Sequence, residues 1–126
     1  MKTWEEWIEE QRGLCEARDV AWAATDREMI VGVADNVMTS QTPVNGLRFN
    51  RGEGTSGWYV WSGTELSNSP DFFKPRCAEH LLDLNPELLK FLGLPVGYRF
   101  LYDDSGFVDV WFDENLLHVD GLEEIE

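Results

Sequence analysis

The stretch Gly57-Trp58-Tyr59-Val60-Trp61-Ser62-Gly63 decides how the rest of the chain is interpreted. Aromatic and β-branched residues between two glycines predict a short strand. Alternation places Trp58 and Val60 on one face of that strand and Tyr59 and Trp61 on the other. Because both faces carry large apolar side chains, we expect a central core strand that is covered on each side. The alternative is that one aromatic face belongs to a partner-binding surface, where Trp and Tyr are enriched.

The length and composition are those of one globular domain spanning residues 1–126. The chain has 126 residues, of which 43% are hydrophobic, enough to bury a core without disulfides. No apolar run approaches the roughly 18 residues that cross a bilayer. The acidic N-terminus lacks the basic start and apolar core of a signal peptide. We therefore expect a cytoplasmic protein.

Charge is the strongest global signal. The chain has 24 acidic and 10 basic residues, which gives a formal net charge of −14. Residues 101–126 contain nine acidic residues and no Lys or Arg, and residues 1–28 contain eight acidic and four basic residues. Such a field repels nucleic acid and anionic membranes and speeds association with a basic partner. The alternative is that the charge serves only solubility.

The first segment has the signature of a capped helix over residues 3–18. Thr3 as N-cap and Glu6 three positions later form a capping box. An apolar stripe interrupted by one glutamine follows at helical spacing, which predicts packing against the core: Trp4, Trp7, Ile8, Gln11, Leu14 and Cys15.

The middle of the chain predicts short strands and loops. Residues 29–34 are typical of a strand, and Asn45-Gly46 is a strong turn signal before a short strand at 47–49. Residues 64–71 predict an exposed loop. Gly52 and Gly54 are too few, and lack the strand–helix context, for a phosphate-binding loop.

The second half predicts two helices and a hairpin. Pro75 fits the first turn of a helix to about residue 84, and Asn85-Pro86 opens a second helix. Residues 98–102 and 107–112 predict two strands joined by a glycine-containing loop, followed by a short helix or acidic tail over 113–126. The fold class is therefore α+β: a single domain with an antiparallel sheet of four to six strands and two to three packed helices.

The sequence offers no strong enzymatic signature. Cys15 and Cys77 are expected to be free thiols, and His80 and His118 are too far apart in sequence to indicate a metal site. Cys77 and His80, three apart on a predicted helix, leave a small Cys–His enzyme as one alternative. Ser62 lacks the G-x-S-x-G context of a nucleophile. We expect no catalytic residue, metal or cofactor.

Several segments follow one another in a recognisable order: Val37-x-x-Ser40, an Arg48-containing strand, Ser56–Glu65, Asn85–Leu89 and Leu94–Phe100. A Ser-Gly-Trp strand that runs into a Ser-Gly-Asp/Glu turn, then an Asn/Asp-Pro helix and a Pro-x-Gly strand, resembles the immunity protein 33 family. The resemblance covers about residues 30–112. The N-terminal helix and the acidic tail lie outside it, and Leu47–Arg51 stands where a tyrosine- or acid-containing strand is expected.

The resemblance implies a bacterial, cytosolic, non-catalytic protein that binds and neutralises a cognate toxin of a polymorphic toxin system. Acidity agrees with a basic toxin such as a nuclease, because nucleases need basic surfaces to hold phosphates. The alternative is an acidic protein-binding adaptor without a toxin partner. The candidate contacts are acidic charge partners and two aromatic anchors: Glu65, Asp103, Asp104, Asp109, Asp113 and Glu114, with Trp61 and Trp111.

Overall fold

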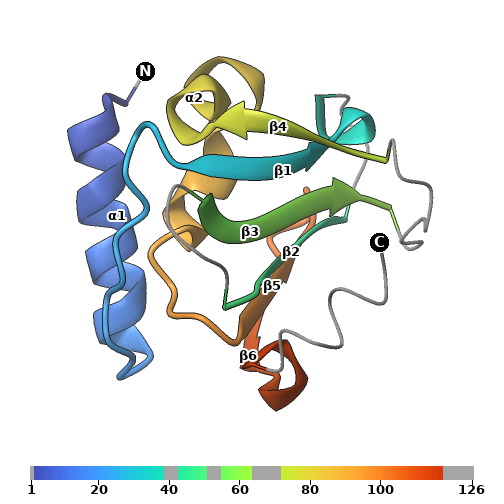
Figure 1. The fold of residues 1–126 in the computed structure, drawn as a ribbon. Coiled ribbons are helices and arrows are strands. Elements are labelled where there is room, and N and C mark those ends of the chain that lie inside the picture. Colours follow the sequence, from blue (N-terminus) through green and yellow to red (C-terminus); the bar gives the residue numbers. More distant parts are fainter. Residues whose placement is uncertain (1, 39–42, 51–54, 64–71, 118–126) are drawn as a thin grey trace.

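A computed structural model describes residues 2–38, 43–50, 55–63 and 72–117. The fold is α+β, with one mixed sheet of six strands in the order β4-β1-β3-β2-β5-β6 (Figure 1). The strands are β1 (Ile30–Ala34), β2 (Val44–Arg48), β3 (Thr55–Ser62), β4 (Phe73–Cys77), β5 (Tyr98–Tyr102) and β6 (Val108–Phe112). The α-helices are α1 (Trp4–Ala17) and α2 (Leu81–Leu84), and the 3₁₀ helices are η1 (Asp35–Met38), η2 (Ala78–His80), η3 (Pro86–Phe91) and η4 (Glu114–Leu117).

The sequence predicted an antiparallel sheet, but the sheet is mixed. β1 and β3 pair in parallel, while the other four neighbouring pairs are antiparallel. β2 follows β1 in the chain but lies two positions away from it in the sheet, and β3 fills the place between them. β3 is antiparallel to β2 and parallel to β1.

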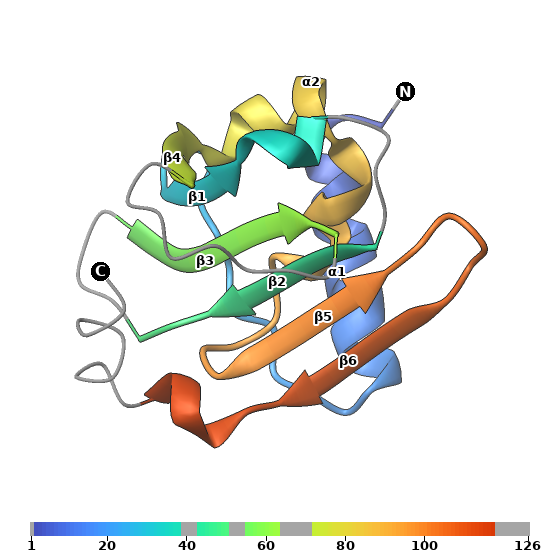
Figure 2. The same ribbon diagram turned by 90° about the vertical axis from the view of Figure 1, so that its right-hand side faces the viewer.

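The capped N-terminal helix is confirmed. The Thr3 hydroxyl accepts from the Glu6 amide at 3.2 Å, and the Glu6 carboxylate accepts from the Thr3 amide at 2.8 Å. Trp4, Trp7 and Cys15 are buried along the predicted stripe. The helices α1 and α2 lie on the same side of the sheet (Figure 2).

Gln11, the polar member of that stripe, joins α1 to η3 and to the connection that follows α1. Its amide nitrogen donates to the Leu89 carbonyl at 2.9 Å, and its amide oxygen accepts from the Trp22 indole at 3.0 Å. The side chain is 1% exposed. Because both the nitrogen and the oxygen of this buried amide are hydrogen-bonded, Gln11 fixes the position of α1 relative to the core.

The central strand is confirmed, since β3 lies between β1 and β2. Trp58 and Val60 are buried on the face covered by the helices, where the Trp58 indole donates to the Leu92 carbonyl at 3.1 Å. On the other face, Tyr59 and Trp61 pack edge-on against Phe73, with ring centroids 5.0 and 6.2 Å apart.

Two predicted elements are wrong. Asn45-Gly46 is not a turn but lies inside β2, where the Phe100 ring covers the position a Gly46 side chain would occupy. Residues 75–77 do not begin a helix but end β4, an edge strand, where proline is tolerated. The helical part starts only at Ala78 and changes from 3₁₀ to α at Leu81.

The second predicted helix is the 3₁₀ helix η3, and Pro86 stands at its start as expected. The Asn85 side chain does not cap it. Instead it donates to the Val37 carbonyl and accepts from the Tyr102 hydroxyl, both at 3.3 Å. Burial raises the pKa of Tyr102, so this hydroxyl stays protonated.

Arg48 is buried in β2 and bonds to four backbone carbonyls. Its guanidinium donates to the oxygens of Ser56, Ala23, Leu94 and Ala24 at 2.8, 3.0, 2.7 and 3.3 Å. Burial lowers the pKa of Arg48 to about 10, so the group remains charged at neutral pH. Within the described residues its partners are carbonyl dipoles rather than a carboxylate.

Candidate functional site

The β5–β6 hairpin and η4 bring most of the predicted contact residues to one end of the sheet. Asp103 and Asp104 lie in the turn, Asp109 and Trp111 lie on β6, and Asp113 and Glu114 begin the segment that contains η4. β6 is the outermost strand at this end (Figure 2). The structure thus places six of the eight candidates together.

Apolar side chains are exposed among these acids. The large hydrophobic residues exposed in the described part of the chain are Phe107, Val108, Phe112 and Leu117, at 52, 37, 50 and 40%. All four lie between residues 107 and 117. We call this region the β6 surface and define it by Asp104, Phe107, Val108, Asp109, Trp111, Phe112, Glu114 and Leu117.

Two of the predicted acids have structural partners. Asp103 closes the hairpin turn: one carboxylate oxygen accepts from the Ser105 hydroxyl at 2.7 Å, the Ser105 amide at 2.9 Å and the Phe107 amide at 3.1 Å. Those bonds, the Ser105 hydroxyl first, lower the pKa of Asp103. Asp113 pairs with Arg99 at 3.1 Å and accepts from the Asn115 amide at 3.1 Å.

Three of the remaining acids are free to meet a partner. Asp104, Asp109 and Glu114 are exposed, and in the described part of the chain no hydrogen bond or ion pair engages their carboxylates. The only basic residue between 98 and 117 is Arg99. Because Arg99 already pairs with Asp113, it leaves the field of the other carboxylates largely uncompensated.

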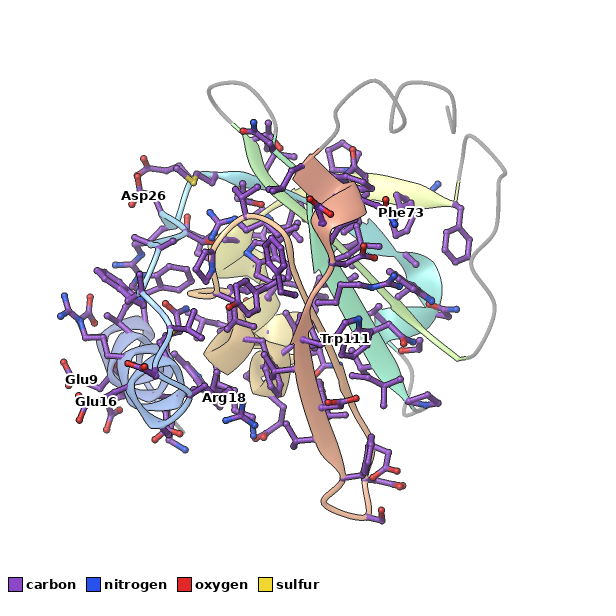
Figure 3. All side chains as sticks on the ribbon, turned by 90° about the horizontal axis from the view of Figure 1, so that it is seen from below. Glu9, Glu16, Arg18, Asp26, Phe73 and Trp111 are labelled. Atoms are coloured by element: carbon purple, nitrogen blue, oxygen red, sulfur yellow. The ribbon has the colours of Figure 1, made fainter. Side chains whose placement is uncertain are left out.

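Trp111 is half-buried and lies on the side of the sheet turned away from α1 (Figure 3). The Arg99 guanidinium stacks 5.4 Å from its ring centroid. Arg99 and Trp111 are direct cross-strand neighbours. The stack and the Asp113 pair hold the indole in place, with part of its surface open to solvent.

Two predicted contacts do not join this surface. Trp61 is 4% exposed and packs against Phe73, so the expectation of an exposed aromatic anchor is wrong for this residue. Its neighbours in the aromatic cluster enclose it because the far face of β3 is packed as well. Glu65, together with the predicted loop at 64–71, lies outside the described residues.

The sequence analysis missed the exposed apolar residues Val108, Phe112 and Leu117. Val108 and Phe112 share a face with Val110, which the pattern alone assigns to the core. The position of β6 at the sheet edge shows that this face extends beyond the helices. A hint of this exposure was present in the sequence, because the strand has apolar residues on both faces and lies in the most acidic part of the chain.

The structure provides little for catalysis in its described part. Cys15 and Cys77 are free cysteines. Cys77 ends β4, His80 is exposed in η2, and no hydrogen bond joins them among the described contacts. Ser62 is 1% exposed. No group of three or more His, Cys, Asp or Glu side chains in the described ranges is placed to hold a metal ion.

None of the described helices has the length and apolar character needed to cross a bilayer. Comparison with protein-family models matches residues 10–113 to the Imm33-like domain. The chain belongs to the Imm33-like family. No curated protein and no solved structure matches it.

The Imm33-like match contains all six strands and begins within α1. The N-terminal helix therefore does not lie wholly outside the family pattern, as the resemblance over about residues 30–112 suggested. The match ends at Asp113, so it includes β6 and the hairpin turn but not Glu114 or Leu117. The family thus covers the scaffold and most of the β6 surface.

Proposed function

We propose that this Imm33-like protein binds a cognate bacterial toxin and neutralises it without catalysis, acting in the cytoplasm. Family membership supports an immunity role in general terms. The observation that carries the proposal is the β6 surface, where exposed apolar side chains and unpaired carboxylates lie on the two faces of an edge strand. Contiguous exposed apolar surface bordered by polar residues is typical of protein–protein interfaces.

The charge of the β6 surface supports a basic partner. Asp104, Asp109 and Glu114 are fully available, and the net charge of −14 adds a long-range field of the same sign. Charge complementarity of this kind mainly raises the association rate and discriminates against wrong partners. Phe107 and Phe112 would supply the apolar contact area that slows dissociation. A toxin that binds nucleic acid has the basic surface this arrangement requires.

Co-expression with a candidate toxin domain taken from a neighbouring gene tests the proposal. Cells producing that domain should survive with the wild-type protein and die when Asp104, Asp109 and Glu114 are all replaced by Lys. The matched control replaces Asp26, Glu28 and Asp83 with Lys; these residues are exposed, lie before β1 and in α2, and should leave protection intact.

Both triple variants change the net charge equally, so a difference between them reports position rather than total charge. Failure of the wild-type protein to bind the toxin domain or to protect cells would sink the proposal. Equal loss of protection in both variants would show that bulk acidity, and not the β6 surface, acts on the toxin.

A further inference from the structure

β6 is an open sheet edge. Its inner side pairs with β5 over the full strand, from Tyr98–Phe112 to Tyr102–Val108. On its outer side, no described strand is paired with it. Figure 2 shows β6 and the hairpin at the border of the sheet, with α1 behind them. An unpaired edge is a template for another strand.

The register identifies which backbone groups are available. The Asp103 amide donates to the Phe107 carbonyl at 3.1 Å, and the Asp113 amide donates to the Gly97 carbonyl at 2.7 Å. In an antiparallel pair, hydrogen-bonded positions alternate with non-bonded ones. Odd-numbered residues of β6 therefore bond to β5. The N–H and C=O groups of Val108, Val110 and Phe112 point away from β5, toward the open side.

The opposite edge of the same sheet is protected, and β6 is not. β4 has the sequence Phe-Lys-Pro-Arg-Cys, in which proline and basic residues discourage pairing with another strand. β6 has the sequence Val-Asp-Val-Trp-Phe, with no proline, no lysine and one charge. Both edge strands have five residues. The difference in composition singles out β6 as the edge that is left open to a partner.

A groove beside Val108 extends this edge toward α1. It has a volume of about 380 Å³ and is lined by acidic, basic and apolar side chains: Glu9, Glu10, Gly13, Leu14, Arg18, Lys90 and Val108. Side chains of a strand added to β6 would reach this groove on the helix side and Asp109 on the other side. Carboxylates therefore border both faces of the edge.

We propose that the toxin binds by adding an extended basic segment to β6, with main-chain hydrogen bonds to Val108, Val110 and Phe112. This inference rests on the proposed function. Strand addition gives affinity through the backbone, while flanking side chains give specificity. The unpaired Asp109 carboxylate on the sheet selects Lys or Arg in that segment, while the groove, with Glu9 and Glu10 beside Arg18 and Lys90, accommodates side chains of either charge. A second copy of this chain fits less well, because it would bring the same carboxylates together.

Amide hydrogen exchange of the wild-type protein, with and without the purified toxin domain, tests the pairing directly. In the free protein the amides of Val108, Val110 and Phe112 should exchange fast, while those of Asp109 and Trp111 are protected by β5. In the complex all five should be protected. Binding with the three outer amides still fast would overturn strand addition and leave the proposed function standing, whereas absence of binding would overturn both.

Proline variants provide the second test. Val108→Pro and Val110→Pro each remove one outward N–H without removing a bond to β5, and should weaken toxin binding at least tenfold. Val108→Thr and Val110→Thr keep the N–H and should bind nearly as the wild type. Circular dichroism establishes that each variant is folded. Equal affinity of the folded proline and threonine variants for the toxin domain would contradict the proposal. A wild-type protein that is a dimer, and that either proline variant converts to a monomer, would also contradict it, because β6 would then pair with a second copy of the chain.

Discussion

The guanidinium of Arg48 donates to the carbonyl oxygen of Leu94 at 2.7 Å, which joins β2 to the segment between η3 and β5. The same group bonds to Ala23 and Ala24, in the connection after α1, and to Ser56 in β3. One buried side chain therefore ties together four segments that are distant in sequence. The planar guanidinium suits this role because its donors point in several fixed directions.

Arg48→Lys should destabilise the protein by roughly 3 kcal/mol, because lysine cannot reach all four carbonyls and leaves buried acceptors unpaired. Urea unfolding followed by tryptophan fluorescence measures the change. The control is Arg12→Lys, at an exposed residue that stacks on Trp22. It should change stability by less than about 0.5 kcal/mol. A similarly small effect of Arg48→Lys would contradict the structural role of this residue.

Gly46→Ala should destabilise the sheet by about 1–3 kcal/mol, the usual cost of overpacking a core position. A Cβ atom at Gly46 would overlap the ring of Phe100, which is 1% exposed and cannot move aside freely. The matched control is Gly13→Ala in α1, where no atom lies within 4 Å of the added carbon. That substitution should stabilise the protein by up to about 1 kcal/mol through helix propensity. Thermal unfolding should show the two alanine variants shifted in opposite directions.

Gly46 also shows why part of the fold could not be predicted from the sequence. Asn-Gly is a local turn signal, but the ring that covers Gly46 comes from β5, far along the chain. A strand glycine paired with a distant aromatic cannot be recognised from its neighbours. Pro75 misled the prediction for a similar reason, because proline is tolerated both at the start of a helix and in an edge strand.

Elements with strong local signals were predicted correctly. Thr3 and Glu6 cap α1 as expected, and the turn from Asp103 to Gly106 joins β5 and β6. The candidate contact residues stay a prediction, and their carboxylates were named from charge alone. The division between structural acids, such as Asp103, and free acids, such as Asp104, depends on hydrogen bonds that only the folded hairpin makes.

Asp103→Asn should reduce the sensitivity of the protein to acid. The folded-state pKa of Asp103 lies below its ordinary value of 3.8, so its carboxylate stabilises the fold above that pH. This contribution is lost as pH falls from 3.8 through the lower folded-state pKa. The free energy of unfolding, measured by urea at several pH values, should fall less steeply on acidification in Asp103→Asn than in the wild type. Asp104→Asn is the control and should follow the wild-type profile; identical profiles for both variants would contradict the assignment.

The free carboxylates of the β6 surface should set the association rate with the toxin domain. Replacing Asp104, Asp109 and Glu114 with Asn, Asn and Gln removes charge and keeps shape. The association rate constant at low salt should fall about tenfold, within the range that electrostatic steering supplies. It should also become less dependent on salt, because screening acts on exposed charges. Stopped-flow fluorescence at several salt concentrations measures both effects.

The control for this rate experiment neutralises Asp26, Glu28 and Asp83, which removes the same amount of charge before β1 and in α2. Its association rate should fall by less than about twofold, because charges more than a Debye length from the interface are screened. Dissociation should change little in either variant, since the apolar side chains Phe107 and Phe112 remain. If both variants slow association equally, steering comes from the net charge of the whole protein, and the three carboxylates hold no special position.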